Sequence, residues 1–144
     1  MDYSIRRERL SPEEYVAFLK RTDLGSQYPK ERFEERVAAL VKSVPISLTA
    51  RDSAGELLGV CFGITDFAYW LFITDLGVVR THTGRGIGRA LMGRALEAAG
   101  GEENIIMYTC PNENAVAFYE KLGMRSTDSL MVYNRVEWTE FTVT

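Results

Sequence analysis

Apolar and polar residues follow two different periods along the chain, and this predicts both helices and strands. A short strand is expected over residues 3–8. Ser11 and Pro12, followed by two glutamates, mark a helix start, because serine is a favoured N-cap and proline fits the first helical position. That helix is expected to run through Lys20, and helical spacing of apolar residues predicts a second helix over residues 30–42.

The middle of the chain is predicted to form strands. Residues 46–50 and 57–64 flank a turn sequence and predict a hairpin. Residues 69–79 are almost continuously apolar, which is typical of a central strand covered on both faces. Another strand is expected over residues 105–109.

Helices are expected between and after these strands, over residues 86–99 and 112–122. Weak alternation in residues 130–136 and 138–143 predicts two closing antiparallel strands. The resulting order, β-αα-ββ-β-α-β-α-ββ, describes an α+β domain. Its sheet would be mixed and mostly antiparallel, flanked by about four helices, and its only parallel crossover would use the helix over residues 86–99.

Composition narrows the class of protein. The 144 residues suit one domain over residues 1–144, and 46% apolar residues are ordinary for a globular chain. The longest apolar run, residues 67–73, is far short of the roughly 20 residues of a membrane span. The first residues lack the apolar stretch of a signal peptide, so we expect a cytoplasmic protein without membrane attachment. His82, Cys61 and Cys110 are too few and too scattered for a zinc site, and no metal is expected.

Charge is unevenly distributed. The net charge is −3, which argues against binding nucleic acid through bulk charge. Residues 76–96 nevertheless carry four arginines and no acid, with three glycines at 84, 86 and 88. Glycines between a buried strand and a helix let backbone amides converge at a helix N-terminus, which favours a pyrophosphate ligand. The alternative is a tight turn beside a solvated basic helix face. The loop matches neither of two common phosphate-binding motifs. The dinucleotide fingerprint that starts at Gly84 requires a third glycine where Arg89 stands, and the P-loop requires lysine there.

A second motif, over residues 112–124, identifies the kind of phosphate-binding loop to which the glycines belong. Residues 83–88, Thr-Gly-Arg-Gly-Ile-Gly, match the glycines of Arg/Gln-x-x-Gly-x-Gly/Ala, and residues 112–124 match Asn-x-x-Ala-x-x-Phe/Leu-Tyr-x-Lys-x-Gly-Phe/Met throughout. With this order and spacing, the chain resembles the GNAT superfamily of acetyl-CoA-dependent N-acetyltransferases over about residues 3 to 136. Thr83 departs from the Arg or Gln that is usual at its position, and Arg80 stands in place of a usual proline.

The resemblance implies a binding role for two strand residues and the glycine loop. Val78 and Val79 would pair their backbone with the pantetheine arm, residues 84–89 would bind the pyrophosphate, and Asn112 would bind pantetheine or cap its helix. The cofactor-binding residues implied in this way are Leu76, Val78, Val79, Thr83, Gly84, Arg85, Gly86, Ile87, Gly88, Arg89, Asn112 and Phe118.

Two residues are candidates for catalysis. The resemblance implies that Tyr119 protonates the departing CoA thiolate, which suits a phenol with an ordinary pKa of about 10; the alternative is a core aromatic. Asp75 is an acid inside an apolar strand, where burial would raise its pKa and suit it as a base for the amine. A structural aspartate, with a water chain serving as the base, is the alternative for Asp75.

These observations predict an enzyme that transfers the acetyl group of acetyl-CoA directly to a primary amine of a small molecule. Polyamines, arylalkylamines and aminoglycosides all remain open as acceptors. The alternatives are a protein or peptide N-acetyltransferase and a non-catalytic CoA-binding sensing module. The resemblance implies an acceptor pocket built from residues 10–44. The tail over residues 137–144, with Trp138 and Phe141, is a candidate homodimer edge.

Overall fold

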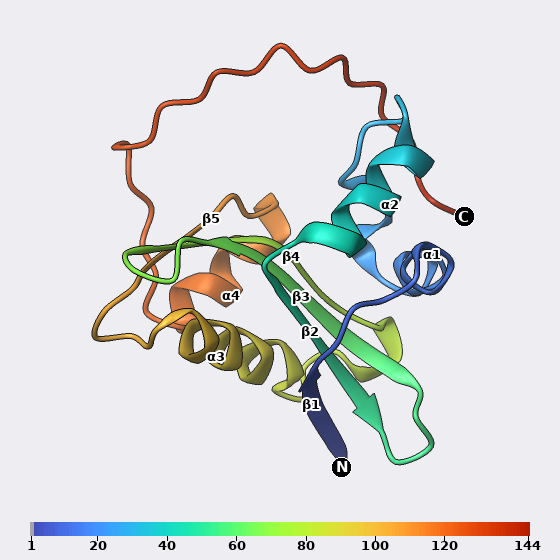
Figure 1. Ribbon diagram of the computed structural model, residues 1–144, viewed down its shortest axis with the longest axis horizontal. Helices are drawn as coiled ribbons and strands as arrows, with labels where there is room; N and C mark the ends of the chain where they lie inside the picture. The colour runs from blue at the N-terminus through green and yellow to red at the C-terminus, as the bar shows by residue number, and fades with distance from the viewer. Residues whose placement is uncertain (1) are drawn as a thin grey trace.

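A five-stranded sheet forms the centre of the molecule in a computed structural model that describes residues 2–144 (Figure 1). The strands lie side by side in sequence order, and β1 to β4 run antiparallel to their neighbours, whereas β5 runs parallel to β4. The strands are β1 Tyr3–Arg7, β2 Ile46–Asp52, β3 Leu57–Thr65, β4 Trp70–Val78 and β5 Ile106–Thr109. The predicted mixed, mostly antiparallel α+β sheet is confirmed.

Helices cover both faces of this sheet, as Figure 1 shows. One face carries α1, α2 and the 3₁₀ helix η1, and the other carries α3 and α4. Their bounds, with those of two further 3₁₀ helices, are α1 Pro12–Lys20, η1 Asp23–Ser26, α2 Phe33–Ser43, η2 Arg80–His82, α3 Ile87–Ala99, η3 Glu113–Ala115 and α4 Val116–Lys121. The predicted N-cap of α1 is confirmed, since the Ser11 hydroxyl accepts the backbone N–H of Glu14 at 3.1 Å.

Two glycines in the sheet set how closely the helices approach it. A methyl group on Gly59 would lie 2.9 Å from Leu91 Cδ1, on the α3 side. A methyl group on Gly77 would lie 2.4 Å from Leu24 Cδ1, on the η1 side. Both distances are below contact distance, so α3 and η1 lie directly on the sheet backbone because these positions lack a side chain.

The two parallel strands separate partway along β4. The β4–β5 pairing runs from Trp70 opposite Ile106 to Ile73 opposite Thr109, and there β5 ends. β4 continues to Val78, so residues 74–78 have no strand partner on that side within residues 2–144. The Thr109 hydroxyl donates to the Ile73 carbonyl at 3.0 Å and closes the paired part. We call the point where β4 and β5 part the strand fork.

The prediction of two closing strands over residues 130–136 and 138–143 is wrong. The tail forms an arch that leaves α4, stands away from the sheet and returns beside α2 (Figure 1). The Lys30 N–H donates to the Thr139 carbonyl, and the Val143 N–H donates to the Gly25 carbonyl, both at 2.9 Å. These bonds tie the tail to η1 and to the loop before α2. Alternation allows a strand, but a strand also needs a partner edge, and these contacts lead elsewhere.

Two helix boundaries also differ from the prediction. α2 begins at Phe33, later than expected, because Arg32 adopts a left-handed conformation with φ 54°. The expected helix over residues 112–122 is divided into η3 and the short α4. Among residues 2–144, no helix is both long and apolar enough to cross a membrane.

Candidate active site

The glycine loop forms the N-terminus of α3. Gly84 and Gly86 have φ values of 76° and 84°, a left-handed conformation that glycine adopts without strain, and the space beside both α-carbons is open. Gly86 is the N-cap of α3 and makes no side-chain cap hydrogen bond, and no acid lies in the first turn. The first amides of α3 are therefore left without a capping side chain at the positive end of the helix dipole, which suits an anionic ligand.

Several predicted cofactor-binding residues meet beside this loop. A methyl group on Gly88 would lie 3.3 Å from Phe118 Cζ and 3.9 Å from Val78 Cγ2. The structure thus brings the start of α3, helix α4 and the end of β4 together. Ile87, only 1% exposed, anchors the first turn of α3 in the core against β3.

The remaining predicted cofactor residues lie at the edges of this group. Leu76 is half-buried on the unpaired part of β4. Val79 is buried, and both of its backbone polar groups are engaged: its N–H donates to the Leu58 carbonyl and its carbonyl accepts the His82 N–H, both at 2.9 Å. Arg89, in the first turn of α3, and Asn112, the N-cap of η3, are exposed.

Thr83 and its neighbours depart from the family pattern in a way that the structure explains. The Thr83 hydroxyl donates to the Arg80 carbonyl at 3.3 Å. The Arg80 guanidinium binds Asp23 at 2.9 Å and the carbonyls of Lys20 and Thr22. Arg80 therefore fastens the end of β4 to the α1–η1 junction. Arg85 lies in the loop and is exposed.

Asp75 is the buried carboxylate of β4, with 3% of its surface exposed. Its Oδ1 accepts hydrogen bonds from the Tyr28 hydroxyl and the Gln27 side-chain amide, and from the Tyr15 hydroxyl at 3.3 Å. The Thr74 hydroxyl donates to Oδ2 at 2.8 Å. All four donors are uncharged, and we call these five residues the Asp75 cluster.

Burial raises the pKa of Asp75, because a carboxylate loses solvation in the core. The hydrogen bonds from Tyr28, Thr74, Tyr15 and Gln27 lower it again, but they do not reverse the shift. A carboxylate with a raised pKa and no cationic partner is suited to accept a proton.

Tyr119 lies on α4, and its hydroxyl is at the strand fork. It is 9% exposed and hydrogen-bonded to Thr109, whose own hydroxyl binds the Ile73 carbonyl at 3.0 Å. Burial raises the pKa of Tyr119, the hydrogen bond with Thr109 lowers it, and the nearby charges of Cys61 and Asp75 raise it further. The phenol therefore keeps its proton at neutral pH, as a proton donor must.

Sequence reasoning missed the partners of Asp75. Tyr15, Gln27 and Tyr28 come from α1 and the segment after η1, and no motif marks them. Tyr15 follows the apolar stripe of α1 and looks like a core aromatic. It does pack on Phe62 with 4.8 Å between ring centroids, but its hydroxyl also reaches Asp75.

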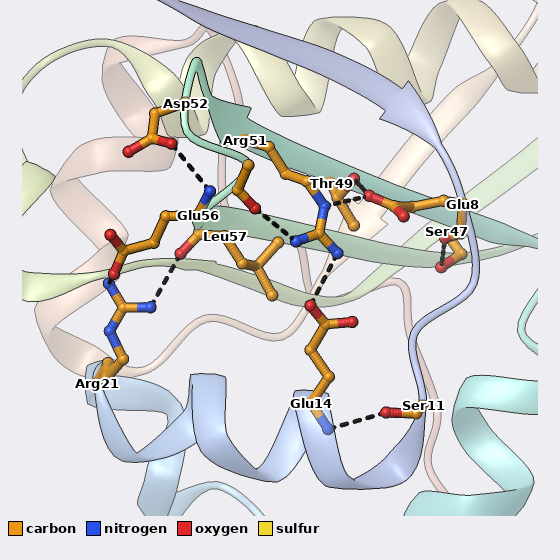
Figure 2. Close-up of polar contacts among 11 residues, drawn as sticks. Glu8, Ser11, Glu14, Arg21, Ser47, Thr49, Arg51, Asp52, Glu56 and Leu57 are labelled. Atoms are coloured by element: carbon orange, nitrogen blue, oxygen red, sulfur yellow. Dashed lines mark hydrogen bonds and ion pairs between the residues drawn. The ribbon is translucent and has the colours of Figure 1, made fainter.

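A second carboxylate cluster lies near the C-terminal end of β2 (Figure 2). The Glu8 carboxylate accepts hydrogen bonds from Thr49 and from Arg51 Nε, the latter at 2.6 Å. Arg51 Nη2 also binds Glu14 at 2.9 Å, so one arginine joins two acids. We call these four residues the Arg51 cluster.

Comparison with known proteins agrees with this geometry. Residues 9–124 match the model of the acetyltransferase (GNAT) family. Among solved structures, a putative acetyltransferase from Deinococcus radiodurans R1 superposes with a TM-score of 0.69 at 20% identity, covering 92% of this chain and 88% of its own. A GNAT family acetyltransferase from Brucella melitensis in complex with acetyl-CoA gives a TM-score of 0.65 at 21% identity, covering 86% and 83%.

An aminoglycoside N-acetyltransferase in complex with CoA gives a TM-score of 0.65 at 13% identity, covering 94% of this chain and 97% of its own. No curated protein matches the sequence. The structural likenesses show the fold, and the family model covers most of the chain. The chain therefore belongs to the GNAT family of acetyltransferases.

Proposed function

We propose that this protein transfers the acetyl group of acetyl-CoA directly to a primary amine of a small molecule. One observation carries the proposal: Asp75, a buried carboxylate bonded only to neutral donors, lies on the part of β4 just past the strand fork, and the Tyr119 phenol is hydrogen-bonded to Thr109 at that fork. These are a proton acceptor and a proton donor of the kinds that amine acylation by a thioester requires.

The residues present fit a CoA thioester. The uncapped start of α3 suits the pyrophosphate, and the unpaired residues 74–78 of β4 offer backbone groups to an extended pantetheine arm. Acetyl-CoA, when bound, supplies an acyl carbonyl activated by its sulfur leaving group. Tyr119, at the strand fork, would then face the sulfur from the α4 side of the sheet.

The proton balance assigns one task to each side chain. An ammonium acceptor, with an ordinary pKa of about 10.4, must lose a proton before it attacks, and Asp75 receives this proton. A C–N bond then forms and the C–S bond breaks, while Tyr119 gives its proton to the sulfur. The second proton lost by the nitrogen restores Tyr119 through solvent, and Asp75 releases its proton to solvent. The reaction yields an amide, free CoA thiol and one proton.

The test is CoA thiol release from acetyl-CoA in the presence of small primary amines or of peptides with free N-termini and lysines. We expect release with small amines. Tyr119→Phe should lower kcat about 10²-fold, the size usual for a proton donor. Tyr108→Phe is the matched control, since Tyr108 lies on the neighbouring β5 and packs on Trp70, with 5.8 Å between ring centroids.

Other outcomes identify the alternatives. Release with peptides and not with small amines would replace the proposed acceptor by a protein or peptide. A melting temperature that rises with acetyl-CoA, without thiol release for any acceptor, would indicate a CoA-binding module without catalysis. Equal kcat for Tyr119→Phe and the unaltered protein would contradict the assignment of Tyr119 as the proton donor.

A further inference from the structure

A cleft beside α2 reaches the Asp75 cluster through one shared side chain. It has a volume of about 250 Å³ and is lined by Tyr28, Pro29, Phe33, Arg36, Val37 and Leu40. Tyr28 packs edge-on against Phe33, with 6.0 Å between ring centroids, and its hydroxyl donates to Asp75. The same side chain therefore contributes both to the wall of the cleft and to the surroundings of the proposed base.

The lining of this cleft is apolar apart from one positive charge. Pro29, Phe33, Val37 and Leu40 present carbon, and no lining residue is an acid. Arg36 is half-buried and forms no ion pair with any of residues 2–144.

Glu31 is an acid whose charge interacts with Arg36, and its carboxylate is hydrogen-bonded to the tail. Glu31 accepts hydrogen bonds from the Thr139 N–H at 2.7 Å and the Thr139 hydroxyl at 2.5 Å. A ligand with a second positive charge would therefore meet Arg36 in this cleft and find no lining carboxylate to balance that charge.

A second cleft shows what a carboxylate-bearing site looks like in the same chain. It holds about 200 Å³, and its lining includes Glu14, Arg21, Arg51 and Glu56. Both acids are already paired: Glu14 with Arg51 at 2.9 Å, and Glu56 with Arg21 at 2.8 Å. None of these four residues belongs to the Asp75 cluster, so this cleft is separate from the proposed base.

We infer that the cleft beside α2 holds the body of the acceptor, and that this acceptor is a monoamine with an apolar or aromatic body rather than a polyamine or an aminoglycoside. Its amino group lies at the Tyr28 end, toward Asp75, and its apolar body lies along Phe33, Val37 and Leu40. Arg36 excludes a second cation and favours a neutral or anionic far end. This inference rests on the proposed function and narrows its substrate class.

The test uses three acceptors of equal length that differ only at the far end: hexylamine, 1,6-diaminohexane and 6-aminohexanoate. The kcat/KM for 1,6-diaminohexane should be about tenfold below that for hexylamine, the order expected for one unfavourable charge at a half-buried site. 6-Aminohexanoate should match or exceed hexylamine. A kcat/KM for the diamine equal to or above that for hexylamine would overturn the inference.

Substitutions at Arg36 and Arg32 test whether the discrimination between the diamine and hexylamine arises in this cleft. Arg36→Glu should raise the diamine-to-hexylamine ratio of kcat/KM about tenfold, because it replaces repulsion by attraction. The matched control is Arg32→Glu, because Arg32 precedes α2, does not line the cleft and pairs with Glu35 in an exposed site. An unchanged ratio in Arg36→Glu would overturn the inference, as would an equal change in Arg32→Glu.

A filled cleft gives a further readout. Leu40→Trp should raise the KM for hexylamine and leave the KM for acetyl-CoA unchanged, whereas Ala39→Trp, on the exposed side of α2, should change neither. An unaltered hexylamine KM in Leu40→Trp, with a native melting temperature, would contradict this location.

Binding without turnover separates this inference from the proposed function. In the presence of CoA, hexylamine and 6-aminohexanoate should raise the melting temperature, and 1,6-diaminohexane should raise it less. This order without thiol release would support the cleft while refuting the proposed reaction. Thiol release with all three amines at equal kcat/KM would support the reaction and refute the cleft.

Discussion

The Asp75 cluster and the Arg51 cluster place the same functional group in opposite surroundings. Asp75 receives hydrogen bonds from hydroxyl and amide groups and has no cationic partner among residues 2–144. Glu8 receives a hydrogen bond from the guanidinium of Arg51 at 2.6 Å (Figure 2). Asp75 is in the core, whereas the side chain of Glu8 is 28% exposed.

Because of this difference, the pKa values of the two acids are shifted in opposite directions from their ordinary values. Burial raises the pKa of Asp75, and its neutral donors only reduce that effect. Partial burial also pushes the pKa of Glu8 upward, but hydrogen bonds from Arg51 and Thr49 and the charge of Arg51 outweigh it, so the pKa of Glu8 lies below its ordinary value. A buried acid thus becomes a candidate base when its partners are neutral, and a structural anion when its partner is a cation.

The largest effect is expected from exchanging the acids for their amides. Asp75→Asn should lower kcat/KM about 10³-fold, within the range for loss of a general base, because the amide cannot accept a proton at neutral pH. Glu8→Gln is the matched change in the other cluster and should leave kcat/KM within about twofold, since Glu8 is not placed at the reaction centre. Thiol-release kinetics measure both. An Asp75→Asn enzyme of normal activity would leave the role of base to water.

The next effect is on stability. Arg51→Met should lower the free energy of unfolding by about 2 kcal/mol, because Glu8 and Glu14 lose charged hydrogen-bond donors. Arg32→Met is the control, since the Arg32–Glu35 pair is exposed and 3.6 Å long, and it should cost less than about 0.5 kcal/mol. Denaturant titration measures both, and equal losses would contradict the distinction between the two ion pairs.

A smaller effect concerns the pH profile. Tyr28→Phe removes a hydrogen bond that lowers the pKa of Asp75, so the acid limb of kcat/KM should move to higher pH, by about one unit or less. Tyr15→Phe should move the limb less, because its hydrogen bond is longer, at 3.3 Å. An acid limb that stays in place, or moves to lower pH, would exclude Asp75 as the titrating base.

The smallest effect is the pH dependence of stability, which should have opposite signs in the two clusters. The lowered pKa of Glu8 means that its stabilising contribution is present at neutral pH and is lost as the pH falls through the folded-state pKa. The raised pKa of Asp75 means that its contribution is present at acid pH and is lost as the pH rises through its folded-state pKa.

Denaturant titrations at pH 4, 5.5 and 7 compare these signs. The stability deficit of Glu8→Gln relative to the unaltered protein should shrink toward pH 4. The stability of Asp75→Asn relative to the unaltered protein should rise from pH 4 to pH 7. The same sign in both variants would show that the two acids are held in similar surroundings.

Local signals were enough for much of the fold. The long apolar run correctly predicted β4 in the interior of the sheet, and the glycine loop with the following helix correctly predicted the β4–α3–β5 crossover. An acid inside an apolar run requires partners, which marks Asp75 in the sequence, and the structure supplies those partners. The prediction for the tail is wrong, because alternation describes a segment and says nothing of the edge on which that segment would pair.

The sequence by itself determined the elements, the glycine loop and the presence of one anomalous acid, because these depend on residues near each other in the chain. Only the tertiary structure decided which donors surround Asp75: Tyr28 and Gln27 are 47 and 48 residues away from it in sequence. It also decided that Arg51 joins Glu8 to Glu14, and that one wall of the apolar cleft reaches the proposed base. The pKa of an acid depends on the charges and dipoles packed around it, so the chemistry of Asp75 follows from the packing of α1 and η1 on the sheet, and that of Glu8 follows from its contacts with Thr49 and Arg51 of β2.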